Sequence, residues 1–575
     1  MVINGHAAEC GPGVETTGNA VDFFLDRHIR EGRGARTAFI DESGSITYKA
    51  LCEAAAGFAS GLAREAVHRE TRIALILLDT IAFPIAFWGA LRAGVVPVLV
   101  NTLLPAAQIR YILEDCRAEA AIVSATLLPA LAAALAEIPG LRLVVVADDA
   151  VRGVDSAEPE LLPVRCLGFA AFIAGDRDVR PVTASAEELA FLLYTSGSTG
   201  KPKGVRHVHG SLRFTAETFG ARVLGITAED LVFSVAKLFF AYGFGNAMTF
   251  PLSVGGAAVL SPGRATPEHV LALMAQHRPS IFYGVPTLYA RLLNEPGLGR
   301  GAGSDRLRCC ISAGEALPAQ IGRRWAAITG VDILDAVGST EMLHAYLSNR
   351  PGAVRYGSCG RAVPGYDVRL VDEDGVDVEG AGAGELMVRG ESMADGYWNQ
   401  RKKTRQTFLG EWTVTGDCYT RDADGIYTFC GRTDDMFKVC GIWVSPVEVE
   451  ASLISHEAVL GAAVVADQDD HGLTKPRAFV VLKPDRATSP QLIAQLQEHV
   501  KQQIGPWKFP RWIEFVPDLP ETVTGKIQRF RLRGLSSTGV SPGHGISSWP
   551  AVGRNGSAAP MAAHRGNWDE RIEAG

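Results

Sequence analysis

The 575-residue sequence lacks the features that mark nucleic-acid-binding and membrane proteins. Lys and Arg number 56 against 63 Asp and Glu, a net charge of −7, so no basic excess exists to neutralise a phosphate backbone. The first twenty residues show no basic stretch followed by an apolar core, so no signal peptide is expected. The most apolar long segment, residues 121–136, is shorter than the roughly 20 residues that a membrane span needs. These absences predict a cytoplasmic protein that binds neither nucleic acid nor membranes.

Cysteine is scattered and forms no metal-binding pattern. None of the ten cysteines belongs to a Cys-x-x-Cys pair, and none has a histidine at ligand spacing. Cys309 and Cys310 are adjacent within an apolar segment that predicts a buried strand. The pattern favours core thiols in a reducing compartment and gives no support for a zinc or redox site.

The most informative stretch is residues 194–204, Tyr-Thr-Ser-Gly-Ser-Thr-Gly-Lys-Pro-Lys-Gly, which follows the apolar run 189–193. The run predicts a short buried strand, and the stretch after it predicts a loop. Glycines allow backbone N–H groups to turn towards an anion, hydroxyls donate further hydrogen bonds, and lysines supply positive charge. This combination suits a polyphosphate.

Three other interpretations compete for this loop. A Walker P-loop requires four residues between its first Gly and the Gly-Lys-Ser/Thr end, but Gly197 and Gly200 enclose two, and Pro202 takes the hydroxyl position. A serine-hydrolase elbow requires a Gly where Ser196 stands. A flexible polar turn remains the structural alternative. The loop is therefore interpreted as a phosphate binder that is not a P-loop.

The order of strand and helix patterns predicts an α/β fold. Residues 20–185 alternate apolar strands with helices, and a second such series follows the phosphate loop, which predicts two doubly wound α/β sheets. Past Gly360, short strands separated by Asp/Gly turns predict an antiparallel meander or small β-barrel. We expect a large domain over 1–433, a small mobile α+β domain over 434–535, and a disordered tail over 536–575.

The loop at 194–204 closely resembles the phosphate-binding loop of the adenylate-forming enzymes, which include acyl- and aryl-CoA ligases, luciferases and peptide-synthetase adenylation domains. Five further segments resemble motifs of this superfamily in the same order, and the resemblance covers about residues 20–533. These segments are Asp-Ala-Val-Gly-Ser-Thr-Glu at 335–341, Thr-Gly-Asp at 415–417, Gly-Arg-Thr-Asp-Asp-Met-Phe-Lys at 431–438, Cys-Gly-Ile-Trp-Val-Ser-Pro at 440–446 and Thr-Gly-Lys-Ile at 524–527.

The resemblance implies a role for each motif. Thr340 would contact a phosphate, Glu341 would hold Mg²⁺, Asp417 would accept hydrogen bonds from the ribose hydroxyls, and Arg432 would contact the ribose and phosphate region. Thr340, Glu341 and Lys526 would be the catalytic residues. The full set implied for ATP and AMP is Thr195, Ser196, Gly197, Ser198, Thr199, Gly200, Lys201, Gly314, Glu315, Ala316, Asp335, Gly338, Thr340, Asp417 and Arg432.

The C-terminal motifs imply a moving domain. Asp434 would be the hinge about which the small domain rotates. Gly441, with Lys438 and Trp443, would border the tunnel for the pantetheine arm of coenzyme A, because glycine permits close approach of the thiol chain. Lys526 would neutralise the attacking carboxylate and the developing charge on the α-phosphate.

The substrate pocket is implied by a narrower resemblance. Lys-Leu-Phe-Phe-Ala-Tyr-Gly-Phe-Gly-Asn at 237–246, with Ser-Thr-Glu-Met-Leu-His at 339–344, closely resembles benzoate-CoA ligases. Ala345 stands where strict benzoate enzymes are expected to have a larger aliphatic residue, so a hydroxyl, amino, halogen or methyl substituent would find room. The aromatic side chains could instead be ordinary core. The implied ring site comprises Phe240, Ala241, Tyr242, Gly338, His344 and Ala345.

The sequence thus predicts an ATP-dependent ligase that converts benzoate, or a singly substituted benzoate, to aryl-AMP and then to an aroyl-CoA thioester, using Mg²⁺. An adenylation enzyme that loads a carrier-protein thiol is the nearest alternative, although no carrier-like domain follows residue 533. A non-catalytic nucleotide-binding regulator is disfavoured, because Glu341, Asp417, Arg432 and Lys526 are all present. A monomer or homodimer is expected.

Overall fold

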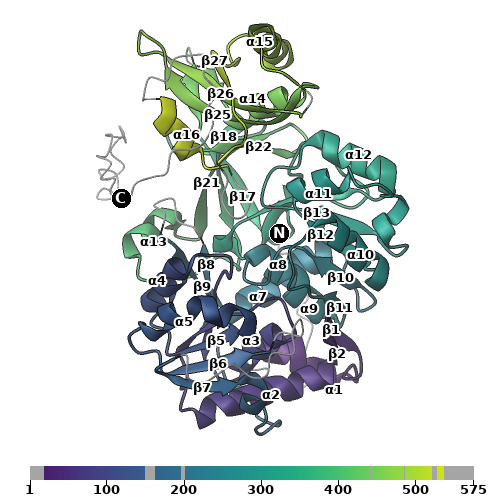
Figure 1. The fold of residues 1–575 in the computed structure, drawn as a ribbon, viewed down its shortest axis with the longest axis vertical. Coiled ribbons are helices and arrows are strands. Elements are labelled where there is room, and N and C mark those ends of the chain that lie inside the picture. The colour runs from purple at the N-terminus through teal and green to yellow at the C-terminus, as the bar shows by residue number, and fades with distance from the viewer. Residues whose placement is uncertain are drawn as a thin grey trace, which may run out of the picture. The chain divides into compact units, whose positions relative to one another are not determined.

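The computed structural model describes residues 18–148, 162–195, 201–439, 442–484, 486–520 and 527–536. The chain divides into two compact units, of which the larger extends to Met436 and the smaller begins at Phe437 (Figure 1). The expected domain limits, 1–433 and 434–535, and the hinge at Asp434 stay predictions. Among the described residues, no helix has the length and apolar character that a membrane span requires.

The first sheet of the large unit has eight strands in the order β19-β9-β8-β4-β3-β5-β6-β7, and every strand runs in the same direction except β9. Ile73 and Leu75 of β3 share one core with α2 and α3, whereas Ala74 and Ile76 share another with α4 and α5 (Figure 1). Helices thus cover both faces, as expected. The elements are α2 (Tyr48–Arg64), β3 (Arg72–Ile76), α3 (Ala82–Arg92), β4 (Val96–Leu99), α4 (Ala106–Cys116), β5 (Ala120–Ser124), α5 (Leu128–Ala136), β6 (Leu143–Ala147), β7 (Arg165–Gly168), α6 (Phe169–Phe172), β8 (Leu189–Thr195), β9 (Lys203–Val208) and β19 (Gly396–Tyr397).

The second sheet has nine strands in the order β16-β15-β14-β13-β12-β10-β11-β1-β2, with antiparallel strands at both edges. Cys309 and Cys310 of β13 are buried in cores on opposite faces, which confirms the predicted buried strand. The elements are β1 (Thr37–Asp41), β2 (Gly44–Thr47), β10 (Leu231–Ser234), β11 (Ala257–Val259), α10 (Pro267–His277), β12 (Ile281–Gly284), α11 (Pro286–Leu292), β13 (Cys309–Ser312), α12 (Ala319–Thr329), β14 (Ile333–Gly338), β15 (Ala345–Ser348) and β16 (Arg361–Ala362).

The N-terminal hairpin belongs to this second sheet. The turn at 41–44 joins β1 to β2 as the sequence predicts, but β1 pairs in parallel with β11, where Phe39 lies opposite Ala258. The remaining helices near this sheet include π-helical segments. They are η1 (Asp22–Asp26), α1 (Arg27–Arg30), α7 (His209–Thr215), η4 (Ala216–Val223), α8 (Ala241–Phe244), η5 (Gly245–Thr249) and α9 (Phe250–Val254).

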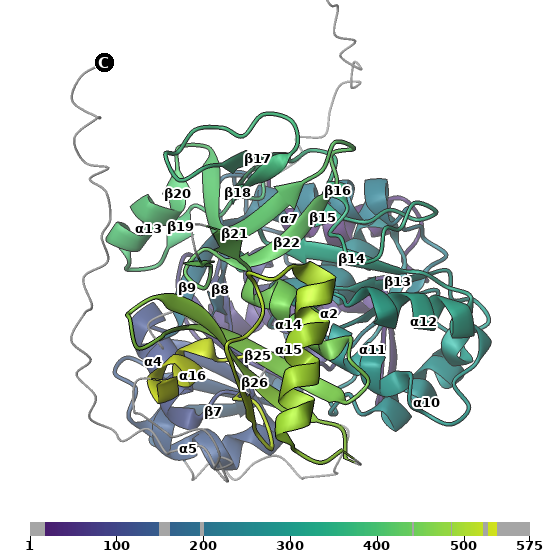
Figure 2. The ribbon, with the colours of Figure 1, turned by 90° about the horizontal axis from the view of Figure 1, so that it is seen from above.

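The third sheet of the large unit is antiparallel and has five strands (Figure 2). Both β20 and β22 pair with β21, and the pairings among the described residues do not join β17 to either of them. The meander expected after Gly360 is therefore an open sheet and not a closed barrel. Its elements are β17 (Asp367–Val371), β18 (Gly382–Arg389), α13 (Arg401–Thr407), β20 (Phe408–Leu409), β21 (Trp412–Arg421) and β22 (Tyr427–Arg432).

The small unit combines strands and helices, as predicted for an α+β domain. Apolar residues of α14 and α15 pack with β25 and β26 in one core. The expected tail from residue 536 lies outside the described residues, apart from Ser536, which ends α16. The elements are β23 (Phe437–Val439), β24 (Ile442–Val444), α14 (Pro446–Ile454), β25 (Val459–Gln468), β26 (Thr474–Leu482), α15 (Pro490–Ile504), β27 (Trp512–Phe515) and α16 (Arg529–Ser536).

Trp325 supports the core between α12 and the second sheet. Its side chain is fully buried, and its ring centroid lies 4.9 Å from that of Tyr289. Trp325→Ala should lower the free energy of unfolding of the large unit by about 3–5 kcal/mol, because the surroundings cannot fill the space left. Urea unfolding followed by circular dichroism measures this loss. Trp325→Phe retains a ring and should cost clearly less; equal losses would contradict the packing argument.

Candidate active site

The nucleotide residues expected near Asp335 lie at the carboxyl ends of β13 and β14. These strands are parallel, with Ser312 opposite Asp335, and the backbone N–H of Leu317 donates to Oδ2 of Asp335 (3.2 Å). The segment that contains Gly314, Glu315 and Ala316 is thereby held beside Asp335. Ligands of open α/β sheets bind outside the carboxyl ends of the strands, so this is a suitable place for a nucleotide.

Asp335 itself is an unusual carboxyl group. It is 5% exposed, and Oδ1 has no hydrogen-bond partner within the described part of the chain. Burial raises its pKa to about 8, although backbone N–H groups of Leu317 and Ala336 oppose the shift. A buried polar atom without a partner is costly, and a ligand that donated to Oδ1 would remove that cost.

The expected ring-site residues meet at the same edge of the sheet. The Tyr242 hydroxyl lies 3.2 Å from both the Gly284 and the Ile311 carbonyl oxygens, at the ends of β12 and β13. The ring of His344 lies 5.8 Å from that of Tyr242, centroid to centroid. Two of the expected aromatic side chains are therefore neighbours.

Gly338 and Ala345 complete this arrangement. The two residues are opposite each other in the antiparallel pair β14–β15. A Cβ atom at Gly338 would lie 2.4 Å from the carbonyl oxygen of His344, so no larger residue fits there. Ala345 is buried, whereas Ala241 and Phe240 are half-buried, and Phe240 packs against Phe239.

His344 is neutral and fixed by a hydrogen bond. Burial lowers its pKa to about 3, and its Nε2–H donates to Oδ1 of Asn246 (3.1 Å). Its ring packs edge-on against Phe250 at 4.6 Å. Asn246 was not among the expected site residues, because a lone amide in an apolar segment carries no functional pattern.

Glu341 lies in a short 3₁₀ turn, η7 (Thr340–Met342), directly after β14. Ser339 caps this turn by accepting a hydrogen bond from the Met342 N–H (3.3 Å). Leu343 then has φ = +63°, a strained conformation for a residue other than glycine, and returns the chain into β15. The turn therefore fixes the spacing between Thr340, Glu341 and the ring site.

The Glu341 carboxylate belongs to a compact polar cluster with Lys203 and Tyr397. Its Oε1 accepts hydrogen bonds from the Tyr397 hydroxyl (2.6 Å) and the Lys203 ammonium (3.1 Å), and Lys203 Nζ lies 2.8 Å from the Tyr397 oxygen. Burial alone would raise the pKa of Glu341, but the charge of Lys203 and the hydrogen bond from Tyr397 hold it below its usual value. Glu341 is therefore ionised.

Lys203 and Tyr397 were not among the expected site residues. Lys203 was counted as one of the two lysines of the phosphate loop, whereas nothing in the sequence indicated Tyr397. The pairing of β19 with β9 places Tyr397 opposite Val205. The expected nucleotide binder Lys201 is exposed, with its ammonium 5.5 Å from the centroid of the Tyr111 ring. Thr195 ends β8 opposite Lys203, and residues 196–200 lie outside the described residues.

Asp417 and Arg432, which are each expected to contact the ribose side of the nucleotide, form an ion pair. They are opposite each other in β21 and β22, and Arg432 Nη1 lies 2.7 Å from Asp417 Oδ1. Burial lowers the pKa of Arg432, but the Asp417 charge more than offsets this and raises it. Burial, then Asp417 and Glu341, raise the pKa of the Tyr346 phenol well above its usual value, so both carboxylates act on one buried side chain of β15.

The remaining expected residues fall in the second half of the chain. Asp434 is exposed in the segment between β22 and β23. Lys438 is exposed in β23, opposite Trp443 of β24 in the hairpin register. Gly441 and Lys526 lie outside the described residues. Their roles stay predictions.

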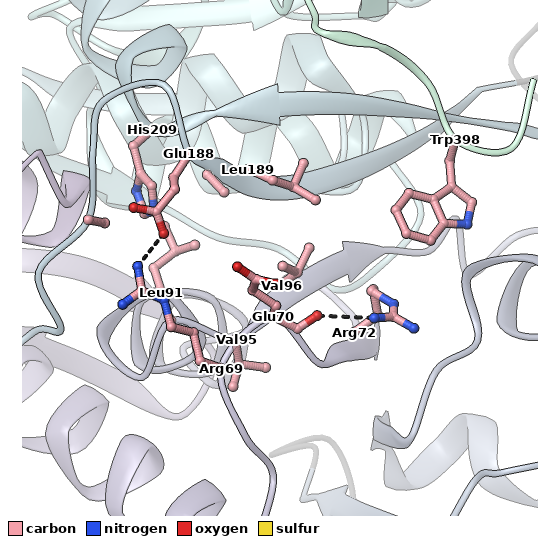
Figure 3. A pocket seen from close by; sticks show the side chains of 13 residues that line it. Arg69, Glu70, Arg72, Leu91, Val95, Val96, Glu188, Leu189, His209 and Trp398 are labelled. Carbon is pink, nitrogen blue, oxygen red and sulfur yellow. Dashed lines mark hydrogen bonds and ion pairs between the residues drawn. The ribbon is translucent and has the colours of Figure 1, made fainter. Parts of the chain in front are cut away.

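A cavity of about 260 Å³ lies elsewhere, at the amino ends of β3, β4 and β8 (Figure 3). None of the expected site residues lines it. Its two arginines are engaged, because Arg69 pairs with Glu188, and Arg72 donates to backbone carbonyls of Glu70 and Cys116. Of the expected residues, Thr195 lies at the other end of β8, its carboxyl end.

Comparison with known proteins identifies the family of the chain. Residues 25–398 match the family described as AMP-binding enzyme, and residues 448–526 match the AMP-binding enzyme C-terminal domain. A 4-hydroxybenzoate–CoA/benzoate–CoA ligase of Rhodopseudomonas palustris is 49% identical over 93% of this chain and 97% of its own length.

Two solved structures show the same fold over most of the chain. The benzoate CoA ligase of Burkholderia xenovorans LB400 has a TM-score of 0.79 and 48% identity, covering 90% of this chain and 99% of its own. The anthranilate CoA ligase AuaEII, solved with anthranoyl-AMP, has a TM-score of 0.83 and 39% identity, covering 91% and 98%. The chain belongs to the AMP-binding enzyme family.

Proposed function

We propose that the protein is an ATP-dependent acid–thiol ligase that converts benzoate, or a singly substituted benzoate, to an aryl adenylate and then to an aroyl-CoA thioester. The observation that carries this proposal is the meeting of Tyr242, His344, Gly338 and Ala345 at the sheet edge that also holds Asp335. The names of the relatives in Rhodopseudomonas palustris and Burkholderia xenovorans support the aromatic acid and coenzyme A as substrates.

The ring site has the chemistry to accept an uncharged aromatic ring. The hydroxyl of Tyr242 is engaged with two backbone carbonyls, which leaves the face of its ring for packing. His344 is neutral, so it adds no charge beside an apolar ring. The small side chain of Ala345 would leave room on β15 for a ring substituent, whereas Gly338 allows the close approach of the His344 backbone.

The first chemical step follows from the weakness of a carboxylate as an electrophile, since it is anionic and has no leaving group. The carboxylate oxygen attacks the α-phosphorus of ATP, the bond to the pyrophosphate oxygen breaks, and pyrophosphate departs. Asp417 and Arg432 would bind the ribose side of the nucleotide. Lys526 would neutralise the incoming carboxylate and the charge that develops on the α-phosphate, which is commonly the largest catalytic contribution.

The second step transfers the aroyl group to a thiol. The thiol sulfur of coenzyme A attacks the aroyl carbonyl, and AMP leaves with the electron pair of the broken C–O bond. Gly441, with Lys438 and Trp443, would border the path of the thiol. We infer that rotation about Asp434 exchanges Lys526 for Gly441 between the two steps.

Glu341 fits the part of a magnesium ligand. It is an ionised carboxylate, and a hard cation prefers such oxygens. The described residues contain no cluster of three or more His, Cys, Asp or Glu side chains that could hold a metal ion by themselves. Mg²⁺ is usually held by one or two carboxylates together with phosphates and water, so Glu341 would hold it jointly with ATP. When bound, the ion would neutralise phosphate charge.

The described cysteines other than Cys430 are free thiols, which supports the proposed cytoplasmic location.

The substrate class is tested by measuring CoA-ester formation with benzoate, with benzoates substituted at each ring position, and with hexanoate as the aliphatic control. We expect kcat/KM for benzoate to exceed that for hexanoate by at least about tenfold, since a flat ring fits the site better than a flexible chain. A preference for hexanoate would refute the aromatic assignment.

Lys526→Ala should lower the rate of benzoyl-AMP formation by about 100- to 1,000-fold, because it removes a charge that stabilises the transition state. Pyrophosphate exchange measures this step. Transfer from preformed benzoyl-AMP to coenzyme A should persist.

Gly441→Leu is the matched variant for the other step. Its added side chain should hinder thioester formation more than adenylation. If Lys526→Ala slowed both steps equally, its assigned role would be wrong.

Ala345→Ile should narrow the range of substrates. The larger side chain would fill the space proposed for a ring substituent, so kcat/KM for substituted benzoates should fall by roughly 10- to 100-fold relative to benzoate. The KM for ATP serves as the internal control and should stay unchanged. An equal loss for benzoate and its derivatives would place Ala345 away from the substituent.

A further inference from the structure

Asp79 is a buried carboxyl group outside the expected site. It follows β3 of the first sheet and is 4% exposed. Its Oδ1 accepts a hydrogen bond from the backbone N–H of Leu238 (3.1 Å), 159 residues further along the chain. Leu238 lies in the segment between β10 of the second sheet and α8. One side chain therefore links the carboxyl end of a first-sheet strand to a loop of the second sheet.

The loop that Asp79 contacts leads directly into the proposed ring site. Leu238 and Phe239 are buried, and the carbonyl of Phe240, which precedes α8, accepts a hydrogen bond from the N–H of Phe244, the last residue of that helix. Ala241 and Tyr242 form the first turn of that helix. A shift of Leu238 would therefore be passed along a few residues of packed backbone to the ring of Tyr242.

Lys237 anchors the same loop from the other side. Its ammonium donates to the carbonyl oxygens of Ser261 (2.5 Å) and Gly263 (2.8 Å), which follow β11. Burial raises the pKa of Asp79 to about 6, and the charge of Lys237 opposes that shift. Attraction to Lys237 and the hydrogen bond from the Leu238 N–H offset the cost of burying the Asp79 carboxylate. Asp79 and Lys237 together therefore keep the loop in one place.

A second carboxylate makes the reverse connection. Asp41 ends β1 of the second sheet, and its Oδ2 accepts the N–H of Ile81 (2.8 Å), in the turn that leads into α3. Residues 79–81, which follow β3, thus make two hydrogen bonds to segments of the second sheet. The Asp79 carboxylate accepts one from Leu238, and the Ile81 N–H donates the other to Asp41. Such reciprocal hydrogen bonds fix the position of the loop more strictly than apolar contact alone.

We propose that Asp79 is a positioning residue for the aromatic acid: it holds the 237–242 segment so that Ala241 and Tyr242 form one wall of the ring site. The proposal rests on the proposed function, because it assigns the acid to that site. Asp79 acts through the backbone of Leu238 and is not proposed to touch the substrate.

A purely structural role for Asp79 makes a different prediction, and Asp230 supplies the matched control. Asp230 is also a buried carboxylate, but it precedes β10, at the amino end, and bonds to Arg308, Ser280 and the Thr227 N–H. Asp230→Asn should lower stability and leave the substrate constants of the folded enzyme unchanged. A substitution at Asp79 that acts through stability alone would behave in the same way.

The kinetic test compares Asp79→Ala, Asp79→Asn and Asp230→Asn in pyrophosphate exchange at the same concentration of folded full-length protein. Asp79→Ala should raise the KM for benzoate by about 10- to 100-fold, while the KM for ATP stays within about twofold, because displacement of a positioning loop costs rates of this order. Asp79→Asn keeps the acceptor oxygen, so it should restore most of the loss. If Asp79→Ala does not fold, Asp79→Asn takes its place in the test. Any rise in KM that remains in Asp79→Asn should be seen for benzoate and not for ATP.

Hydrogen exchange supplies a readout that does not depend on the substrate. In Asp79→Ala the amide of Leu238 should exchange at least about tenfold faster than in the wild type, because it has lost its acceptor. Asp230→Asn should not change it. If the wild type failed to activate benzoate, the proposed function would fall, and exchange at Leu238 would still decide whether Asp79 holds the loop. Equal rises in both KM values, or an unchanged Leu238 amide, would overturn the proposal.

Discussion

The hydrogen-bonded cluster of Lys203, Glu341 and Tyr397 joins the two large sheets. Lys203 begins β9 and Tyr397 ends β19, both in the first sheet, whereas Glu341 follows β14 of the second. Two charged groups are taken out of bulk water here, which is tolerable because each is paired and hydrogen-bonded. Removing one partner would leave an unpaired buried charge. The ion pair therefore holds the two sheets together, and the sheets in turn keep the two charges paired. The phosphate loop and the 3₁₀ turn at Thr340 are attached to the two sides of this connection.

The same cluster bears on the proposed role of Glu341 as a metal ligand. Lys203 occupies, beside Glu341, the kind of position that a divalent cation would need. An ionised Glu341 that is already neutralised by Lys203 costs little in the absence of ligand, and in the proposed role it would exchange this positive partner for Mg²⁺. Asp335 differs from Glu341, since burial raises its pKa and so favours the protonated form. The pKa values of these two buried carboxyl groups are thus shifted in opposite directions.

Much of the fold could be predicted because strands and helices follow local periodicity, and the alternating series before and after the phosphate loop indicated both α/β sheets. Partner choice is not local. The hairpin β1–β2 was predicted, but only the fold shows that β1 pairs with β11, and a meander pattern does not specify whether its ends meet. Glu341, Asp417 and Arg432 could be proposed as site residues because each lies in a motif. Lys203, Tyr397, Asn246 and Asp79 acquire their surroundings from pairing and packing between distant segments, which no spacing in the sequence encodes.

Leu343 connects the proposed metal ligand Glu341 to His344 of the proposed ring site. Its left-handed backbone costs on the order of 1–3 kcal/mol, and it stands between Glu341 and His344 with no flexible linker on either side. The Glu341 carboxylate, proposed to hold the metal, and the His344 imidazole of the proposed ring site are thus connected by a short rigid segment of backbone. Changes that tilt His344 to suit a new acid would tilt Glu341 as well. Evolution of acid preference is therefore easier on the walls that move independently, namely α8 and the side chain at 345, than on the turn that connects the two chemistries.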